Sequence, residues 1–273
     1  MPPRRTLVAV AAATLAAGAA GAALPGRGLP RTFRDGVLGD VPVCRGGITG
    51  VQLREGSRRE ARTEAERDID FMEKLGLLDG HLLIGRTLLE AGELRLAIPH
   101  FGHPVQELYS WLESHLAARQ APPFEDQLRA LERLAQANDG GPAFAAAWDA
   151  VYAKLAAARA TVDPGRAADP RFLIEHIAMM VEAVAGDYGE SIARGRITNI
   201  LEYHDSAGFL RYALGVSAAS APKSPRAFAA VAAELGWIKG NAFPHLLPPQ
   251  RPPVSVSAVR ERADRLRALA AEA

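Results

Sequence analysis

The residues best suited to chemistry in this 273-residue chain are histidines and carboxylates that gather in two segments. In the first segment, His103 precedes Glu107 by four positions, so one turn of helix would place the imidazole and the carboxylate on the same face. His100 lies close by, and His81 precedes both. Imidazole suits iron, copper and zinc, and carboxylate suits harder ions. This segment therefore predicts a transition-metal site.

The second segment contains Glu202, His204 and Asp205 as near neighbours. We expect Glu202 and His204 to contribute to the same site from the other half of the chain. The predicted metal ligands are His103, Glu107, His100, His81, Glu202 and His204.

The sequence lacks the motifs expected of a hydrolase, a nucleotide-binding protein or a c-type cytochrome, and the basic net charge expected of a nucleic-acid-binding protein. No glycine pattern of a nucleophile elbow surrounds the serines, and Gly46-Gly47 has no strand-then-helix context for binding a nucleotide. The chain contains no Cys-x-x-Cys-His motif, which excludes covalent c-type haem. With 32 basic and 31 acidic residues, the net charge of +1 provides no general field for nucleic acid. We expect a protein that is not an enzyme and binds neither haem, nucleotide nor nucleic acid.

The first 23 residues have the pattern of an export signal. Arg4 and Arg5 precede an uncharged, alanine-rich run that ends in small residues typical of a cleavage site. The arginine pair is compatible with a twin-arginine signal or an ordinary one. After cleavage we expect no membrane span and a periplasmic or secreted protein. Cys44 is the single cysteine, so no internal disulfide can form.

The rest of the chain favours an all-α fold. Leucine and alanine dominate the apolar residues, which recur at helical spacing, and no convincing alternating strand is present. We expect an antiparallel bundle of about six to eight helices. Its predicted parts are a Gly/Pro-rich lead-in at residues 24–57, a helical bundle domain at 58–243, and a Pro-rich segment with a C-terminal helix at 244–273. The segment from Pro99 to Pro104 is predicted to be a loop.

A weak internal repeat relates the two halves. Shifting residues 77–109 by 103 positions places Gly92 on Gly195 and His100 on Tyr203. The sequence therefore allows two related helix-pair halves, and it would bring the regions of His100 and His204 to related positions.

Gly102-His103-Pro104-Val105-Gln106-Glu107 and Glu202-Tyr203-His204-Asp205, within a helical exported chain, resemble the imelysin-like family of periplasmic iron-uptake proteins. Members of that family are helical bundles of two related halves and carry a Gly-x-His-x-x-Glu motif associated with metal. Here the histidine stands one place earlier, directly after the glycine. The resemblance covers about residues 58–217 and implies iron, which makes His103 and Glu107 the first candidates for its ligands.

The sequence thus predicts an exported helical protein that binds a transition metal for uptake or handling, with iron favoured over copper or zinc. Its expected partners are the metal ion and a membrane transport or assembly protein. The alternative is a non-enzymatic periplasmic interaction protein without metal, whose Gly/Pro-rich lead-in and Pro-rich segment would serve as docking arms.

Overall fold

The computed structural model describes residues 63–273, so the predicted export signal and lead-in lie outside the described residues. The described chain is α-helical apart from two short strands, β1 (Ile192–Ala193) and β2 (Arg196–Ile197), which pair antiparallel. The all-α prediction is confirmed.

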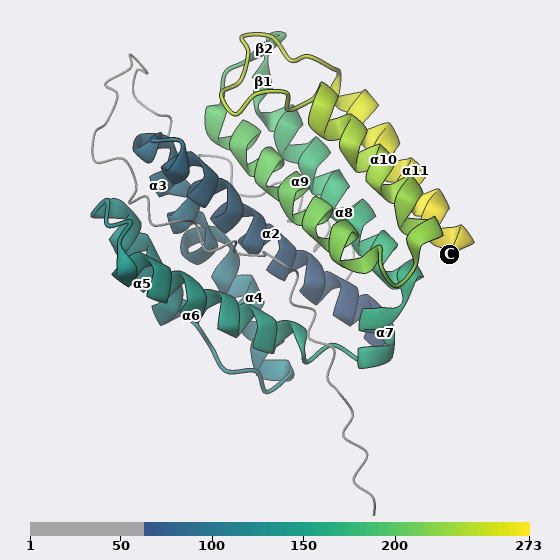
Figure 1. Cartoon of the computed structure of the whole chain (residues 1–273), viewed down its shortest axis with the longest axis horizontal. Helices are drawn as coiled ribbons and strands as arrows, with labels where there is room; N and C mark the ends of the chain where they lie inside the picture. Colours follow the sequence, from purple (N-terminus) through teal and green to yellow (C-terminus); the bar gives the residue numbers. More distant parts are fainter. Residues whose placement is uncertain (1–62) are drawn as a thin grey trace, which may run out of the picture.

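Helix α2 (Glu64–Glu90) runs through the middle of the molecule (Figure 1). It begins with a capping box in which the Thr63 side chain accepts from the Glu66 backbone and the Glu66 carboxylate accepts from the Thr63 N–H. Most of its residues from Asp68 to Leu89 are buried on every side, as expected for a helix covered all round by others. Its few polar residues must therefore find partners on neighbouring helices.

Helices from the first half of the chain cover one side of α2 (Figure 1). They are α3 (Leu94–His103), the π-helix η1 (Pro104–Leu108), α4 (Tyr109–Ala118), α5 (Glu125–Gln136) and α6 (Pro142–Arg159). The predicted loop from Pro99 to Pro104 is wrong, because this segment is helical. Pro99 costs the helix only one hydrogen bond, the one to the carbonyl of the exposed residue Arg95. Pro104 begins the wider π turn, which needs no N–H donor at that position.

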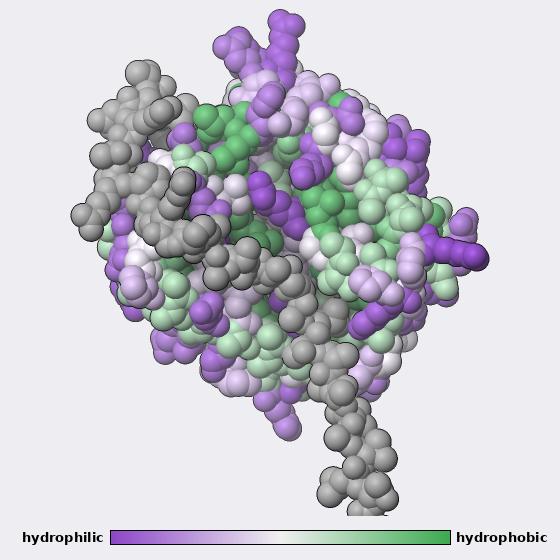
Figure 2. All heavy atoms as spheres, viewed as in Figure 1, coloured by the Kyte–Doolittle hydropathy of each residue, from purple (hydrophilic) through white to green (hydrophobic). Residues whose placement is uncertain are grey.

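The second half of the chain forms a four-helix group on the other side of α2 (Figure 1). After the short α7 (Pro164–Ala168), this group consists of α8 (Pro170–Glu190), α9 (Ile200–Ser220), α10 (Pro225–Asn241) and α11 (Val256–Glu272). Helix α8 packs against α9 and α11, and α9 packs against α2. The face in Figure 2 is mixed in hydropathy, with apolar residues gathered near its middle.

The α2–α3 pair and the α8–α9 pair share a feature at their turns. Gly92 follows α2 with φ 83° and Gly195 follows α8 with φ 71°, a region that favours glycine. These are the two glycines that the internal repeat aligns. The duplication itself stays a prediction, but both pairs lie side by side at the centre of the fold.

Helices α2 and α9 cross at a contact between two glycines. A Cβ atom on Gly208 would collide with the backbone carbonyl of Gly80, and a Cβ on Gly80 would lie 2.6 Å from the Phe209 ring. Glycine at both positions lets the two backbones touch. His81, next to Gly80, is thereby brought close to the polar residues of α9.

Candidate metal centre

Three histidines converge on the carboxylate of Asp205 in the interior. His100 Nδ1 lies 2.7 Å from Asp205 Oδ1, His81 Nε2 lies 3.2 Å from the same oxygen, and His103 Nδ1 lies 3.4 Å from Oδ2. His81 comes from α2, His100 and His103 from the last turn of α3, and Asp205 from α9. All four residues are at most 5% exposed. The fold therefore concentrates three imidazoles and one carboxylate in a dry site.

His81, His103 and Asp205 form a donor set of metal-binding dimensions. Each offers one ligand atom, and the three atoms lie within 4.8 Å of one another. Two imidazoles and one carboxylate are the ligands of many non-haem Fe(II) sites. Copper and zinc also accept these groups, so the donor set alone does not choose among the three metals.

The orientation of His81 leaves a lone pair directed at Asp205. His81 Nδ1 lies 2.8 Å from the Leu77 carbonyl, which can only accept, so Nδ1 carries the hydrogen. Burial lowers the pKa of His81 to about 4, although Asp205 acts in the opposite direction, and the ring is therefore neutral at pH 7. Its Nε2 then has no hydrogen and faces Asp205 Oδ1 across 3.2 Å. Two acceptors at this distance repel each other unless a cation stands between them.

Two further histidines present the same kind of arrangement. His204 Nε2 lies 3.0 Å from the Leu246 carbonyl and must donate to it, while its Nδ1 is buried without a hydrogen bond. His100 binds Asp205 through Nδ1, and its Nε2 is buried without a partner. An imidazole held by one nitrogen and open at the other is the usual state of a metal-binding histidine.

His103 and Asp205 hold opposite charges in this arrangement. Burial would lower the pKa of His103, but Asp205, Glu107 and Glu202 together raise it to about 9. Burial would raise the pKa of Asp205, and the three histidines instead hold it well below its ordinary value. A proton on His103 therefore compensates part of the negative charge that a metal ion would otherwise balance.

A second donor set shares Asp205 with the first. Asp187 of α8 and Glu202 and Asp205 of α9 also place one ligand oxygen each within 4.8 Å of one another. Burial and the charges of Glu202, Asp205 and Glu107 raise the pKa of Asp187 well above its ordinary value. Carboxylates are thus gathered here in a way that costs free energy when all of them are ionised.

The six predicted ligands occupy different places in this centre. His81, His100 and His103 meet at Asp205, and Glu202 belongs to the second donor set. His204 lies at the edge, with its ring 5.7 Å from that of His100. Glu107 is half-buried in the π-helix and acts on His103 through its charge. The ligand assignment itself stays a prediction.

Two residues of the centre were not among the predicted ligands. Asp205 lies in the Glu202-Tyr203-His204-Asp205 segment, so its residue type and position were visible in the sequence. Asp187 stands alone in an apolar helix, and no local pattern connects it to the histidines. Its role depends on how α8 packs beside α9.

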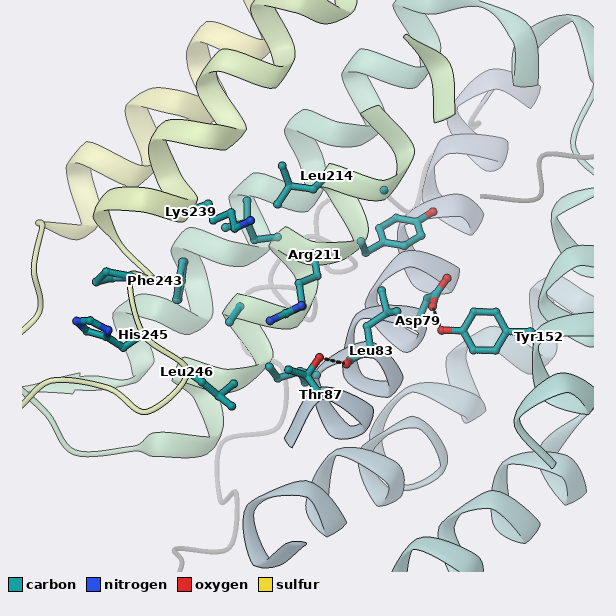
Figure 3. Close-up of a pocket in the computed structure, with 16 residues that line it drawn as sticks. Asp79, Leu83, Thr87, Tyr152, Arg211, Leu214, Lys239, Phe243, His245 and Leu246 are labelled. Carbon is teal, nitrogen blue, oxygen red and sulfur yellow. Dashed lines mark hydrogen bonds between the residues drawn. The ribbon is translucent and has the colours of Figure 1, made fainter. Parts of the chain in front are cut away.

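A surface cavity of about 500 Å³ is lined mainly by residues of α2, α9 and the segment that follows α10 (Figure 3). Figure 3 shows Arg211 projecting toward it between apolar side chains, with Asp79 and Tyr152 at its far end. His81, His100, His103 and Asp205 do not line this cavity. It is therefore separate from the histidine-carboxylate centre.

Comparison with known proteins links the second half of the chain to iron uptake. Residues 164–273, which include Asp187, Glu202 and Asp205, match the family model of the iron permease-associated 4-helix bundle domain. The match points to iron transport and to no enzymatic family. No curated protein and no solved structure was found to match the chain.

The imelysin-like assignment is wrong, because the family that matches is a different one. The broader prediction of a protein connected with iron uptake is supported. Within residues 63–273, no helix combines the length and apolar character needed to span a bilayer.

Proposed function

We propose that this protein is an exported component of iron uptake that binds a transition metal ion, with iron favoured, between His81, His103 and Asp205. The observation that carries the proposal is the neutral His81 ring, whose unprotonated Nε2 faces the Asp205 carboxylate at 3.2 Å. A cation at that point would turn a repulsion into two ligand bonds. His103, once deprotonated, supplies the third.

Iron is favoured by two independent features. The donor set of two imidazoles and one carboxylate suits Fe(II), and residues 164–273 match a domain associated with iron permeases. Zinc and copper are the competing ions, since neither geometry nor donor type excludes them. We expect Fe(II) to bind under anaerobic conditions at neutral pH.

The predicted export signal in the first 23 residues supports a binding step outside the cytoplasm. There, the protein would collect the ion and deliver it to a membrane transport protein, the class with which the matched domain is associated. Its own role requires binding and release rather than catalysis.

The test is thermal unfolding of the purified protein in Fe(II), Cu(II) or Zn(II) solutions, compared with the same protein in chelator. An ion that binds only the folded state stabilises it by about 2.7 kcal/mol at a concentration one hundred times its Kd. We expect Fe(II) to raise the Tm, and expect His81→Gln and Asp205→Asn to remove most of that rise.

Matched controls separate ligand loss from general damage. His245 and Asp149 are exposed, and neither belongs to the donor sets. His245→Gln and Asp149→Asn should therefore retain the full metal-dependent rise in Tm. The proposal fails if none of the three metals raises the Tm of the unaltered protein, or if His81→Gln and Asp205→Asn respond as the controls do.

A further inference from the structure

Asp205 belongs to both donor sets, one with His81 and His103 and the other with Asp187 and Glu202. We propose that the second set holds a second divalent cation, and that the Asp205 carboxylate bridges the two ions. This inference rests on the proposed function, because it extends the first site into a centre of two ions.

The geometry of Asp205 suits a bridge. Its Oδ1 faces His81 and His100, its Oδ2 faces His103, and one of its oxygens also lies within 4.8 Å of ligand oxygens of Asp187 and Glu202. Asp187 approaches from α8 and Glu202 lies one turn before Asp205 on α9. The carboxylate oxygens of the second donor set, which come from α8 and α9, therefore lie next to the first donor set of two imidazoles and one carboxylate.

The carboxylates around Asp187 would attract a cation. One oxygen each of Asp187, Glu202 and Asp205 lies within 4.8 Å of the others. Within residues 63–273, neither Asp187 nor Asp205 forms an ion pair with lysine or arginine. Asp68, Asp70 and Asp79 on α2, by contrast, each pair with lysine or arginine. The fold supplies a base for these three buried aspartates of α2, and no such ion pair is described for Asp187 or Asp205.

An independent feature is the buried nitrogen of His103. This residue is 5% exposed, and its Nδ1 makes no hydrogen bond of acceptable geometry although it lies 3.4 Å from Asp205 Oδ2. The nitrogen faces the carboxylate that the two sets share. With its proton displaced, His103 offers a lone pair to the shared centre.

The experiment measures how many Fe(II) ions bind per chain after anaerobic equilibrium dialysis, by elemental analysis. We expect two ions for the unaltered protein, one for Asp187→Asn and two for the exposed control Asp149→Asn. Glu202→Gln serves as a second variant of the carboxylate set, and circular dichroism verifies that each variant is folded. Both variants should keep the metal-dependent rise in Tm due to the first ion.

The stoichiometry separates this inference from the proposed function. One ion in the unaltered protein, with no further loss in Asp187→Asn or Glu202→Gln, overturns the second site and leaves the first intact. No bound ion overturns both. Two ions that persist in Asp187→Asn and Glu202→Gln place the second ion elsewhere and also overturn the inference.

The bridge has its own test. After loading with two Mn(II) ions per chain, electron paramagnetic resonance should show a spin-coupled pair, because ions that share a carboxylate interact magnetically. Two uncoupled Mn(II) signals would overturn the bridging role of Asp205.

Discussion

Two buried polar clusters begin only two residues apart on α2 and differ in how their charge is balanced. Asp79 pairs with Arg159 at 2.5 Å and accepts a hydrogen bond from Tyr152 at 2.6 Å. His81 faces the Asp205 carboxylate, which has histidines but no arginine or lysine among its described ion pairs. The buried acid of the first cluster is paired with a base inside the protein, and for the second we propose a cation from outside.

The Asp79 cluster extends over three helices besides α2. Arg159 and Tyr152 come from α6, Tyr212 from α9 and His176 from α8, and His176 Nε2 lies 3.0 Å from the Tyr212 hydroxyl. Burial would lower the pKa of Arg159, yet the charges of Tyr212 and Asp79 raise it further above its ordinary value. Arg159 therefore stays charged and ties these helices together.

The comparison teaches how to distinguish a structural from a functional polar cluster. A buried ion pair costs desolvation, which hydrogen bonds must offset, and Asp79 accepts such bonds from both Tyr152 and Arg159. Two nitrogens of this cluster, Arg159 Nε and His176 Nδ1, are nevertheless buried without a hydrogen bond. The Asp205 cluster collects acceptors and carboxylates that repel one another. Such an arrangement persists in a stable fold when a ligand supplies the missing charge.

The largest expected effect concerns the balanced cluster. Asp79→Asn leaves the buried Arg159 without its counter-charge, and breaking a buried pair in this way costs about 3–5 kcal/mol. We expect that loss in the free energy of unfolding measured with urea in chelator. The number of bound metal ions should not change.

Asp149→Asn, the same substitution on the exposed face of α6, is the control and should leave the free energy of unfolding unchanged. A loss of less than about 1 kcal/mol for Asp79→Asn would show that the Asp79–Arg159 pair is not the structural element that the comparison requires.

A smaller effect is expected where α2 and α9 cross. Gly208→Ala introduces a methyl group against the Gly80 carbonyl, and such overpacking costs about 1–3 kcal/mol. The affinity for Fe(II) should also fall, because His81 and Asp205 lie on the two helices that must move apart. The Asp79–Arg159 pair joins α2 to α6 and should persist.

Gly215→Ala provides the matched control, since a Cβ at this position on the same helix meets nothing within 4 Å. That substitution should stabilise the protein by about 0.5–1 kcal/mol through helix propensity and leave Fe(II) affinity unchanged. Equal Fe(II) affinities of Gly208→Ala and the unaltered protein would mean that the metal centre does not depend on this crossing.

The sequence predicted the fold class because helical periodicity and composition are local signals. Helical spacing indicates a helix such as α2 without any tertiary information, and Gly92 with its positive φ stands two residues after the last residue of this helix, Glu90. The Pro99–Pro104 segment was mistaken for a loop because the two prolines suggest a break. A π turn allowed the helix to continue instead.

The candidate site was predictable only in part, for a different physical reason. Histidines are rare enough for their clustering at His81, His100 and His103 to be visible. Asp187 is one of many carboxylates, and it gains its significance when α8 places it beside Glu202 and Asp205. The close approach of α2 and α9 likewise depends on Gly80 and Gly208, whose pairing no local pattern indicates.

A pH-dependent effect tests whether protons reach the interior of the Asp79 cluster. Burial and the charge of Arg159 lower the pKa of His176 from 6.5 to about 3. Tyr212 from α9 and Arg159 from α6 are the titratable and charged groups that face His176. Below pH 6.5 the unfolded chain takes up a proton here, and the folded chain does not until about pH 3.

The contribution of neutral His176 to the free energy of unfolding is therefore fully present above pH 6.5 and declines as the pH falls toward 3. Between pH 7 and 5 the decline amounts to about 2 kcal/mol. His176→Gln should reduce the pH-dependent loss of unfolding free energy by this amount, measured with urea in chelator at both pH values. His245→Gln, at an exposed histidine, should lose stability over this range as the unaltered protein does. An identical loss in His176→Gln would mean that His176 takes up a proton in the folded protein as readily as in the unfolded chain. The Asp79 cluster would then not be the closed structural cluster that the comparison requires.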